Sequence, residues 1–165
     1  YLKKIVDPKK RYQKALIIGA GGVSPSVILA LQKSNISDIS LVNRTHEKSI
    51  FLKNKFKSIK IIKWEEIQKI KKEFDIIINA TSLGLKNQTD FDFVLENFKE
   101  NLVYIDTIYN PIETKMMKYL KSKKVKTYGG LDMFIYQGQK SFYLWNKINP
   151  EINEELLGLL SDKLK

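Results

Sequence analysis

Short runs of apolar residues alternate with stretches of helical spacing along most of the chain. Because these runs are almost continuously apolar, we predict strands that are buried on both faces. The predicted strands are 15–18, 39–42, 60–62, 75–79, 102–106 and 125–128. The predicted helices are 24–33, 46–56, 65–71, 113–122, 132–148 and 151–164.

The regular order of strands and helices predicts an α/β fold with a doubly wound, mostly parallel sheet. The final two helices, which are separated by Pro150, are followed by no further strand. We therefore interpret 1–165 as one domain. We expect its helical segment 132–165 to contact another domain, because a sheet of this kind leaves these helices without an obvious place to pack.

Composition agrees with a single globular domain. The chain has 165 residues, of which 43% are hydrophobic, and no cysteine. A chain of this size can bury a substantial core. Without cysteine we expect neither disulfides nor thiolate metal sites, and we predict no metal site of any kind. No apolar run approaches the ~20 residues of a membrane span, and the opening residues show no signal-peptide pattern, so the sequence favours a cytoplasmic protein.

The chain is strongly basic, with a formal net charge of +11. Basic surfaces can bind nucleic acid. The lysines are spread along the predicted elements, however, and we find no basic stripe interleaved with aromatic residues and no nucleic-acid-binding motif. We interpret the charge as a solvated surface that also attracts a polyphosphate ligand, and we expect no nucleic-acid partner.

The first predicted strand runs directly into a glycine-rich turn and a helix. Such a turn lets backbone N–H groups approach a pyrophosphate, and the dipole of the following helix favours the anion. Ser24 stands in place of the third glycine of the G-x-G-x-x-G pattern, so a plain strand-to-helix turn remains the alternative. The residues predicted to hold the pyrophosphate are Gly19, Ala20, Gly21, Gly22 and Val23.

The end of the second predicted strand indicates which dinucleotide is bound. NAD-binding domains of this class place a carboxylate there to hold the ribose 2′-hydroxyl. This chain has Asn43, Arg44 and Thr45 instead, which suit a 2′-phosphate. A charge-assisted hydrogen bond contributes ~1.5–3 kcal/mol, so Arg44 alone predicts a ~10–100-fold preference for NADP. An ordinary surface arginine is the other interpretation, and His46 is either a further contact or a solvated residue at a helix start.

A third polar segment, Asn79–Gly84, follows the fourth predicted strand. Small and hydroxyl side chains at the carboxyl end of a strand line the crevice in which α/β sheets bind ligands. Thr81 and Ser82 are therefore candidate ligand contacts, and a simple polar turn is the alternative.

Taken together and in this order, these segments resemble the shikimate dehydrogenase family. The three segments correspond to its GAGG, NRT and NATSLG motifs. Two more motifs match further along. Asp106–Thr114 resembles the segment D-x-x-Y-x-P-x-x-T, and Gly130–Gln137 resembles the helix start G-L-x-M-x-x-x-Q. Five motifs in one order make a specific match, which a single glycine turn does not.

The resemblance implies a Rossmann-type NADP-binding domain and the reversible NADP-dependent reduction of 3-dehydroshikimate to shikimate, a step of aromatic amino-acid biosynthesis. By position it assigns Asn43, Arg44 and Thr45 to the adenosine 2′-phosphate. The residues that it assigns to the nicotinamide side are Thr81, Ser82, Thr107 and Gly130.

Two residues are implied to reach the substrate from this domain, namely Tyr109 and Gln137. Without the family, Tyr109 can equally be a packed aromatic residue and Gln137 a solvated helix residue. Met133 and Trp145, which lie in the same C-terminal region, are predicted to pack in the core.

The sequence departs from the family in one major way. In the family, the catalytic lysine, its aspartate partner and most of the shikimate pocket belong to an N-terminal domain, and this sequence shows no counterpart. We therefore predict no catalytic residue in this chain, and we expect it to bind NADP without turning over shikimate, because ketone reduction needs a proton donor as well as a hydride. Pro25 also differs, since many relatives have a basic or small residue there.

Several alternatives stay open. One is a quinate/shikimate dehydrogenase that uses NAD, which Arg44 without a neighbouring carboxylate disfavours. Another is glutamyl-tRNA reductase, which also carries NRT and which the segments around Tyr109 and Gln137 disfavour. A stand-alone, non-catalytic NADP-binding module predicts a natural gene of this length, whereas a fragment predicts a longer natural chain.

Overall fold

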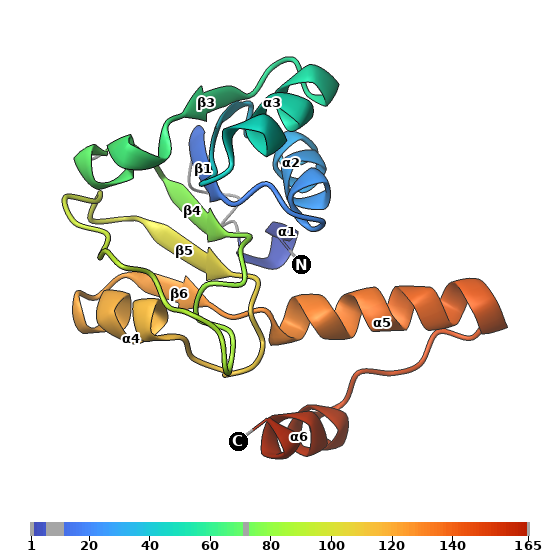
Figure 1. Cartoon of the computed structure of the whole chain (residues 1–165). Coiled ribbons are helices and arrows are strands. Elements are labelled where there is room, and N and C mark those ends of the chain that lie inside the picture. The colour runs from blue at the N-terminus through green and yellow to red at the C-terminus, as the bar shows by residue number, and fades with distance from the viewer. Residues whose placement is uncertain (1, 6–11, 71–72, 165) are drawn as a thin grey trace.

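A parallel sheet forms the centre of the molecule. The computed structural model describes residues 2–5, 12–70 and 73–164. Its six strands lie in the order β3-β2-β1-β4-β5-β6, and every neighbouring pair is parallel (Figure 1). The predicted doubly wound α/β fold is thereby confirmed. The strands are β1 (Lys14–Ile18), β2 (Asp38–Val42), β3 (Lys60–Ile62), β4 (Ile76–Asn79), β5 (Val103–Asp106) and β6 (Lys126–Tyr128).

The helices match the predicted segments to within three residues at each end. The segment expected at 65–71 is a short 3-10 helix, and Lys71 lies outside the described residues. The first helix, α1, was not expected from the sequence. The helices are α1 (Leu2–Ile5), α2 (Ser24–Gln32), α3 (His46–Lys55), η1 (Trp64–Lys69), α4 (Lys115–Ser122), α5 (Leu131–Asn146) and α6 (Glu154–Lys163).

The core lies on both faces of the sheet, because alternate residues of a strand point to opposite sides. In β1, Ala15 and Ile17 pack with the apolar residues of α2 and α3. Leu16 and Ile18 pack on the other face with residues of α4 and η1. All four side chains are fully buried. The sheet is therefore covered on both sides, and only its edges and strand ends are open to a ligand.

The strand order reverses at β1, which pairs with β2 on one side and with β4 on the other. In doubly wound sheets, ligands bind outside the carboxyl ends of the strands at this reversal. Backbone hydrogen bonds tie the three strand ends together. The Gly19 N–H donates to the Val42 carbonyl oxygen at 2.8 Å, and the Ala80 N–H donates to the Ile18 carbonyl oxygen at 2.7 Å.

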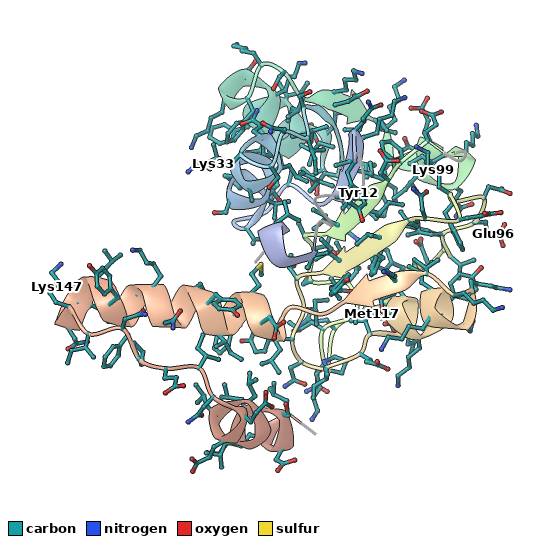
Figure 2. All side chains as sticks on the ribbon, turned by 180° about the vertical axis from the view of Figure 1, so that it is seen from behind. Tyr12, Lys33, Glu96, Lys99, Met117 and Lys147 are labelled. Atoms are coloured by element: carbon teal, nitrogen blue, oxygen red, sulfur yellow. The ribbon has the colours of Figure 1, made fainter. Side chains whose placement is uncertain are left out.

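The last two helices form an arm apart from the sheet. Helix α5 starts beside β6 and extends away from it, and Lys147 marks its far end (Figures 1 and 2). Ile135 is the one buried residue described in α5, and none is described in α6. The prediction that Trp145 packs in the core is wrong, because this part of α5 has no sheet beneath it and the side chain is 80% exposed. Met133 is half-buried.

No helix in the described part of the chain is long and apolar enough to cross a membrane.

Candidate functional site

A cleft of about 490 Å³ opens at the carboxyl ends of the central strands. Nine of the residues predicted to bind the cofactor line it: Gly19, Ala20, Gly21, Gly22, Asn43, Arg44, Thr45, Thr81 and Ser82. Six further residues line it that the sequence analysis did not single out as contacts: Lys48, Trp64, Ala80, Leu83, Gln88 and Thr89. Three separate motifs of the sequence therefore meet in one cavity.

The glycine turn is shaped by its contact with the turn after β4. Gly19 has a φ of +109°, a conformation that side-chain-bearing residues rarely adopt. A Cβ atom there would lie 2.7 Å from both the Ala80 carbonyl oxygen and Thr81 Cγ2. Ser24, in the place of the third glycine, is fully buried, and its hydroxyl donates to the Gly19 carbonyl oxygen at 2.9 Å. Serine thus stabilises the turn through its own hydrogen bond.

The amino end of α2 faces this turn and suits an anion. Among the described residues, no side chain caps the helix and no acidic residue lies in its first turn. Pro25 in the first turn has no N–H to satisfy, which is favourable at this position. The partial positive charge of the helix end therefore remains available to a phosphate group.

Asn43 braces the glycine turn against the loop after β2. Its Oδ1 accepts from the Ala20 N–H at 3.0 Å, and its Nδ2 donates to the Thr45 carbonyl oxygen at 2.7 Å. The side chain thus holds two walls of the cleft at a fixed separation. Its position at the end of β2 gives Asn43 a structural role in addition to any contact with a ligand.

Positive charge gathers at the β2 end of the cleft. Arg44 is exposed, and Lys48 lies one helical turn further on, in the first turn of α3. Neither aspartate nor glutamate occurs among the described residues that line the cleft. A lysine close to a helix N-terminus opposes the helix dipole unless it faces an anion. Thr45 precedes α3 without capping it, so its hydroxyl is also available.

The turn after β4 is built around Asn79, which is fully buried. Its Oδ1 accepts from both the N–H and the hydroxyl of Thr81, at 3.0 and 2.7 Å. Its Nδ2 donates to the Leu83 carbonyl oxygen at 3.2 Å and to Asp106 Oδ1 at 3.0 Å. These bonds fix the chain where Thr81 and Ser82 enter the cleft.

Asp106, at the end of β5, is fully buried and connects the next loop to the sheet. Beside the bond from Asn79, its oxygens accept from the Ile108 N–H at 3.1 Å, the Thr114 hydroxyl at 2.9 Å and the Tyr104 hydroxyl at 3.2 Å. Burial raises the pKa of Asp106 above its ordinary value, although these hydrogen bonds oppose the shift. Burial raises the pKa of Tyr104 well above its ordinary value, and the nearby Asp106 carboxyl group raises it further.

Four of the residues predicted for the nicotinamide and substrate side form a second group around the start of α5, namely Thr107, Tyr109, Gly130 and Gln137. The Gly130 N–H donates to the Ile108 carbonyl oxygen at 2.8 Å, and a Cβ on Gly130 would lie 2.1 Å from the Thr107 carbonyl oxygen. Tyr109 stacks on Phe134 with ring centroids 4.5 Å apart. Gln137 lies one turn after Phe134, on the same side of the helix, and is exposed.

These four residues, with Val23 and His46, do not line the cleft. Val23 precedes α2 and is half-buried, whereas His46 is the exposed first residue of α3. Contacts of these residues with cofactor or substrate remain predictions.

Two of the cleft residues that the sequence analysis did not single out, Lys48 and Trp64, do have a signal in the sequence. Lys48 lies in the first turn of the helix that begins directly after the Asn43–Thr45 segment, where a basic side chain opposes the helix dipole unless it faces an anion. Trp64 follows a strand by two residues, and positions just after strands face the crevice of a doubly wound sheet. Gln88 and Thr89 lie in a long loop for which spacing gives no comparable signal.

A parallel sheet with a glycine turn at its strand reversal and a cleft across the strand ends defines the Rossmann class of dinucleotide-binding folds. The sequence model for Shikimate / quinate 5-dehydrogenase matches residues 2–127 of this chain. The chain belongs to that family.

Similar proteins agree with this assignment. The chain is 47% identical to the shikimate dehydrogenase (NADP(+)) of Pelagibacter ubique over 90% of its own length and 54% of the relative's. It is 39% identical to that of Methanococcus aeolicus, over 92% of this chain and 56% of the relative. The chain thus spans about half the length of the curated relatives it matches.

Solved structures give the same result. The crystal structure of shikimate dehydrogenase from Aquifex aeolicus superposes with a TM-score of 0.75 at 36% identity, covering 91% of this chain and 55% of that one. A shikimate dehydrogenase solved in complex with NADP⁺ superposes with a TM-score of 0.78 at 32% identity, covering 94% and 56%. A quinate dehydrogenase from Corynebacterium glutamicum in complex with NAD has a TM-score of 0.78 at 22% identity, over 87% and 53%, and shares the fold.

Proposed function

We propose that this chain is the NADP-binding part of a shikimate dehydrogenase, which reduces 3-dehydroshikimate to shikimate reversibly in aromatic amino-acid biosynthesis. The observation that carries the proposal is the pairing of Arg44 and Lys48 at the β2 end of a cleft whose described lining has no carboxylate. The family assignment and the names of the relatives support it.

The residues of the cleft fit NADP. The glycine turn and the amino end of α2 suit its pyrophosphate, because the space beside the Gly22 backbone is open and no side chain described there caps the helix. Arg44, Lys48 and Thr45 suit the 2′-phosphate, since a guanidinium, an ammonium and a hydroxyl all donate to phosphate oxygens. Together these groups fix the orientation of the dinucleotide along the strand ends.

The nicotinamide half is assigned to Thr81 and Ser82 in the cleft together with the second group of residues at the start of α5. Thr81, Ser82, Thr107 and Gly130 would lie along the nicotinamide ring, which exchanges a hydride with the substrate when NADP is bound. Tyr109 is held by Phe134, and Tyr109 and Gln137 would reach the hydroxyl and carboxylate groups of shikimate. Asp106 supports this loop from below through Ile108 and Thr114.

A second domain completes the site in this proposal. The C-terminal arm exposes a set of large apolar side chains: Phe134, Phe142, Tyr143, Leu144, Trp145, Ile148, Leu156 and Leu159. A substrate domain that packs on this arm would cover them and would bring the proton donor to the nicotinamide side. The half-length coverage of the relatives supports a longer natural protein, which we place in the cytoplasm.

Without that domain, we expect the chain to produce no measurable NADPH from NADP⁺ and shikimate. Hydride transfer to or from the substrate carbon needs an acid–base group beside the oxygen, and no residue of this chain is assigned to that role. The measurement is the appearance of NADPH absorbance under saturating cofactor and substrate. Turnover by the chain alone would show that the acid–base group lies within these residues.

Arg44→Ala should weaken NADP⁺ binding about 10–100-fold and leave NAD⁺ binding unchanged, because the guanidinium contacts the 2′-phosphate in this proposal. Isothermal titration calorimetry of both cofactors measures the two affinities. Lys33→Ala is the matched control, since Lys33 carries the same charge at the carboxyl end of α2 and does not line the cleft. If Arg44→Ala weakened the binding of NADP⁺ and NAD⁺ equally, Arg44 would not recognise the 2′-phosphate.

An NAD-dependent enzyme is the second candidate, because a quinate dehydrogenase bound to NAD shares the fold. Arg44 and Lys48 disfavour it, since an NAD site of this class usually carries a carboxylate after β2. The same titrations separate the two candidates.

A further inference from the structure

Trp64 lines the proposed cofactor cleft, and aromatic residues of the core hold its side chain in place. It is the first residue of η1 and is half-buried. Its ring meets Phe93 edge-on, with centroids 5.8 Å apart and an interplanar angle of 72°. Phe93 in turn meets Phe91 at 5.1 Å and 61°. Trp64, Phe93 and Phe91 form what we call the aromatic ladder.

The ladder connects the cleft to the core. Phe93 is buried, and Trp64 and Phe91 pack against the same core cluster on the α4 face of the sheet. The indole is therefore held in place by the protein itself, while Trp64 still lines the cleft. An aromatic wall that is ordered in advance loses little side-chain entropy when a ligand packs on it.

The order of the strands relates Trp64 to the proposed cofactor groups. The glycine turn follows β1, Arg44 follows β2 after Asn43, and Trp64 follows β3, which is the outermost strand on this side. Pyrophosphate, 2′-phosphate and Trp64 would thus lie in sequence across the strand ends. The adenine base is attached to the phosphorylated ribose. If the cofactor continues from β2 towards β3, the base would lie next to Trp64.

We propose that Trp64 is the aromatic wall on which the adenine base of the cofactor packs, so that the base becomes the next ring of the aromatic ladder. This inference rests on the proposed function and adds a base-binding residue to it. Gln88 and Thr89, which line the same cleft, supply polar atoms for the edge of the base. Stacking of a base on an aromatic side chain supports a ~5–100-fold gain in affinity.

Fluorescence can isolate Trp64, because the chain has two tryptophans and the other, Trp145, is 80% exposed on the arm. In Trp145→Phe, titration with NADP⁺ or with adenosine 2′,5′-bisphosphate should change the Trp64 emission. The change should saturate with the dissociation constant that calorimetry gives for the same variant. Nicotinamide mononucleotide, which has no adenine, should leave the emission unaltered.

A pair of substitutions tests the energetic contribution of the ring. Trp64→Leu should weaken NADP⁺ binding about 5–100-fold, whereas Trp64→Phe, which keeps a ring against Phe93, should weaken it less. Thermal unfolding checks that both variants fold, and the emission test in Trp145→Phe does not depend on either of them.

The outcomes are distinct. Calorimetric binding of NADP⁺ without any change in Trp64 emission, or Trp64→Leu binding as tightly as the unchanged chain, would overturn the role of Trp64 and leave the proposed function standing. Failure of Trp145→Phe and the unchanged chain alike to bind NADP⁺ would overturn both.

Discussion

Asp106→Ala is expected to lower the free energy of unfolding by about 3–5 kcal/mol, because several buried polar groups lose their shared hydrogen-bond acceptor at once. The substitution leaves the buried amide of Asn79 and the buried hydroxyls of Tyr104 and Thr114 without this acceptor. Each buried group left unpaired costs about 1–3 kcal/mol. Chemical denaturation at neutral pH measures the difference directly.

The control is Asp92→Ala, because Asp92 is exposed and its loss should change the free energy of unfolding by less than about 0.5 kcal/mol. If the Asp106 and Asp92 variants were equally stable, the buried network would not hold the loop after β5 in the way described.

The pH dependence of the free energy of unfolding provides a second test of the role of Asp106. Burial raises the pKa of Asp106 in the folded state above its ordinary value of 3.8. Between pH 3.8 and the folded pKa, the folded protein therefore retains a proton that the unfolded chain has lost. The contribution of Asp106 to the free energy of unfolding is complete below pH 3.8 and is lost as the pH rises through the folded pKa. Asp106→Asn cannot titrate, and its stability relative to the unchanged chain should improve as the pH rises through that window.

Gly19→Ala should impair both folding and cofactor binding. The added Cβ would lie 2.7 Å from the Ala80 carbonyl oxygen, at a φ of +109° that alanine rarely adopts. Strained backbone of this kind costs about 1–3 kcal/mol even without the clash. The clash can be relieved only by moving the glycine turn away from the turn after β4, which would widen the cleft. We expect NADP⁺ affinity to fall at least about 10-fold, since the proposed phosphate contacts would be lost together.

Gly138→Ala is the matched control for that substitution. A Cβ at Gly138 meets nothing within 4 Å, and the residue lies inside α5, where alanine favours the helix. Its stability should rise slightly and its NADP⁺ affinity should not change. A normal affinity in Gly19→Ala, measured by calorimetry, would mean that close packing of the two turns is not needed for binding.

The sheet and the motifs at its strand ends were predictable because both arise from local pattern. Continuous apolar runs such as the one ending at Ile18 mark buried parallel strands, and a glycine turn that leads into a helix is visible in the sequence itself. The meeting of this turn with Arg44 and Thr81 follows from parallel topology, which brings carboxyl ends to one edge.

Other features depend on contacts between distant residues and could not be predicted. The position of Trp64 just after β3 is visible in the sequence, but its ring contact with Phe93, nearly thirty positions away, is not. Asp106 gathers partners from β4, β5 and the start of α4, and no local pattern predicts such a network. Trp145 was misplaced because helical spacing shows which side chains share a face of α5 but not whether another element covers that face.

The most direct measurement is calorimetric titration of the unchanged chain with NADP⁺ and NAD⁺ under the same salt conditions. Our account predicts binding of NADP⁺ at a single site, at least about 10-fold tighter than NAD⁺, because Arg44 and Lys48 would face the 2′-phosphate in the proposed complex. Equal affinities, or tighter binding of NAD⁺, would contradict recognition of that phosphate. Absence of binding by both would contradict the cleft as a dinucleotide site.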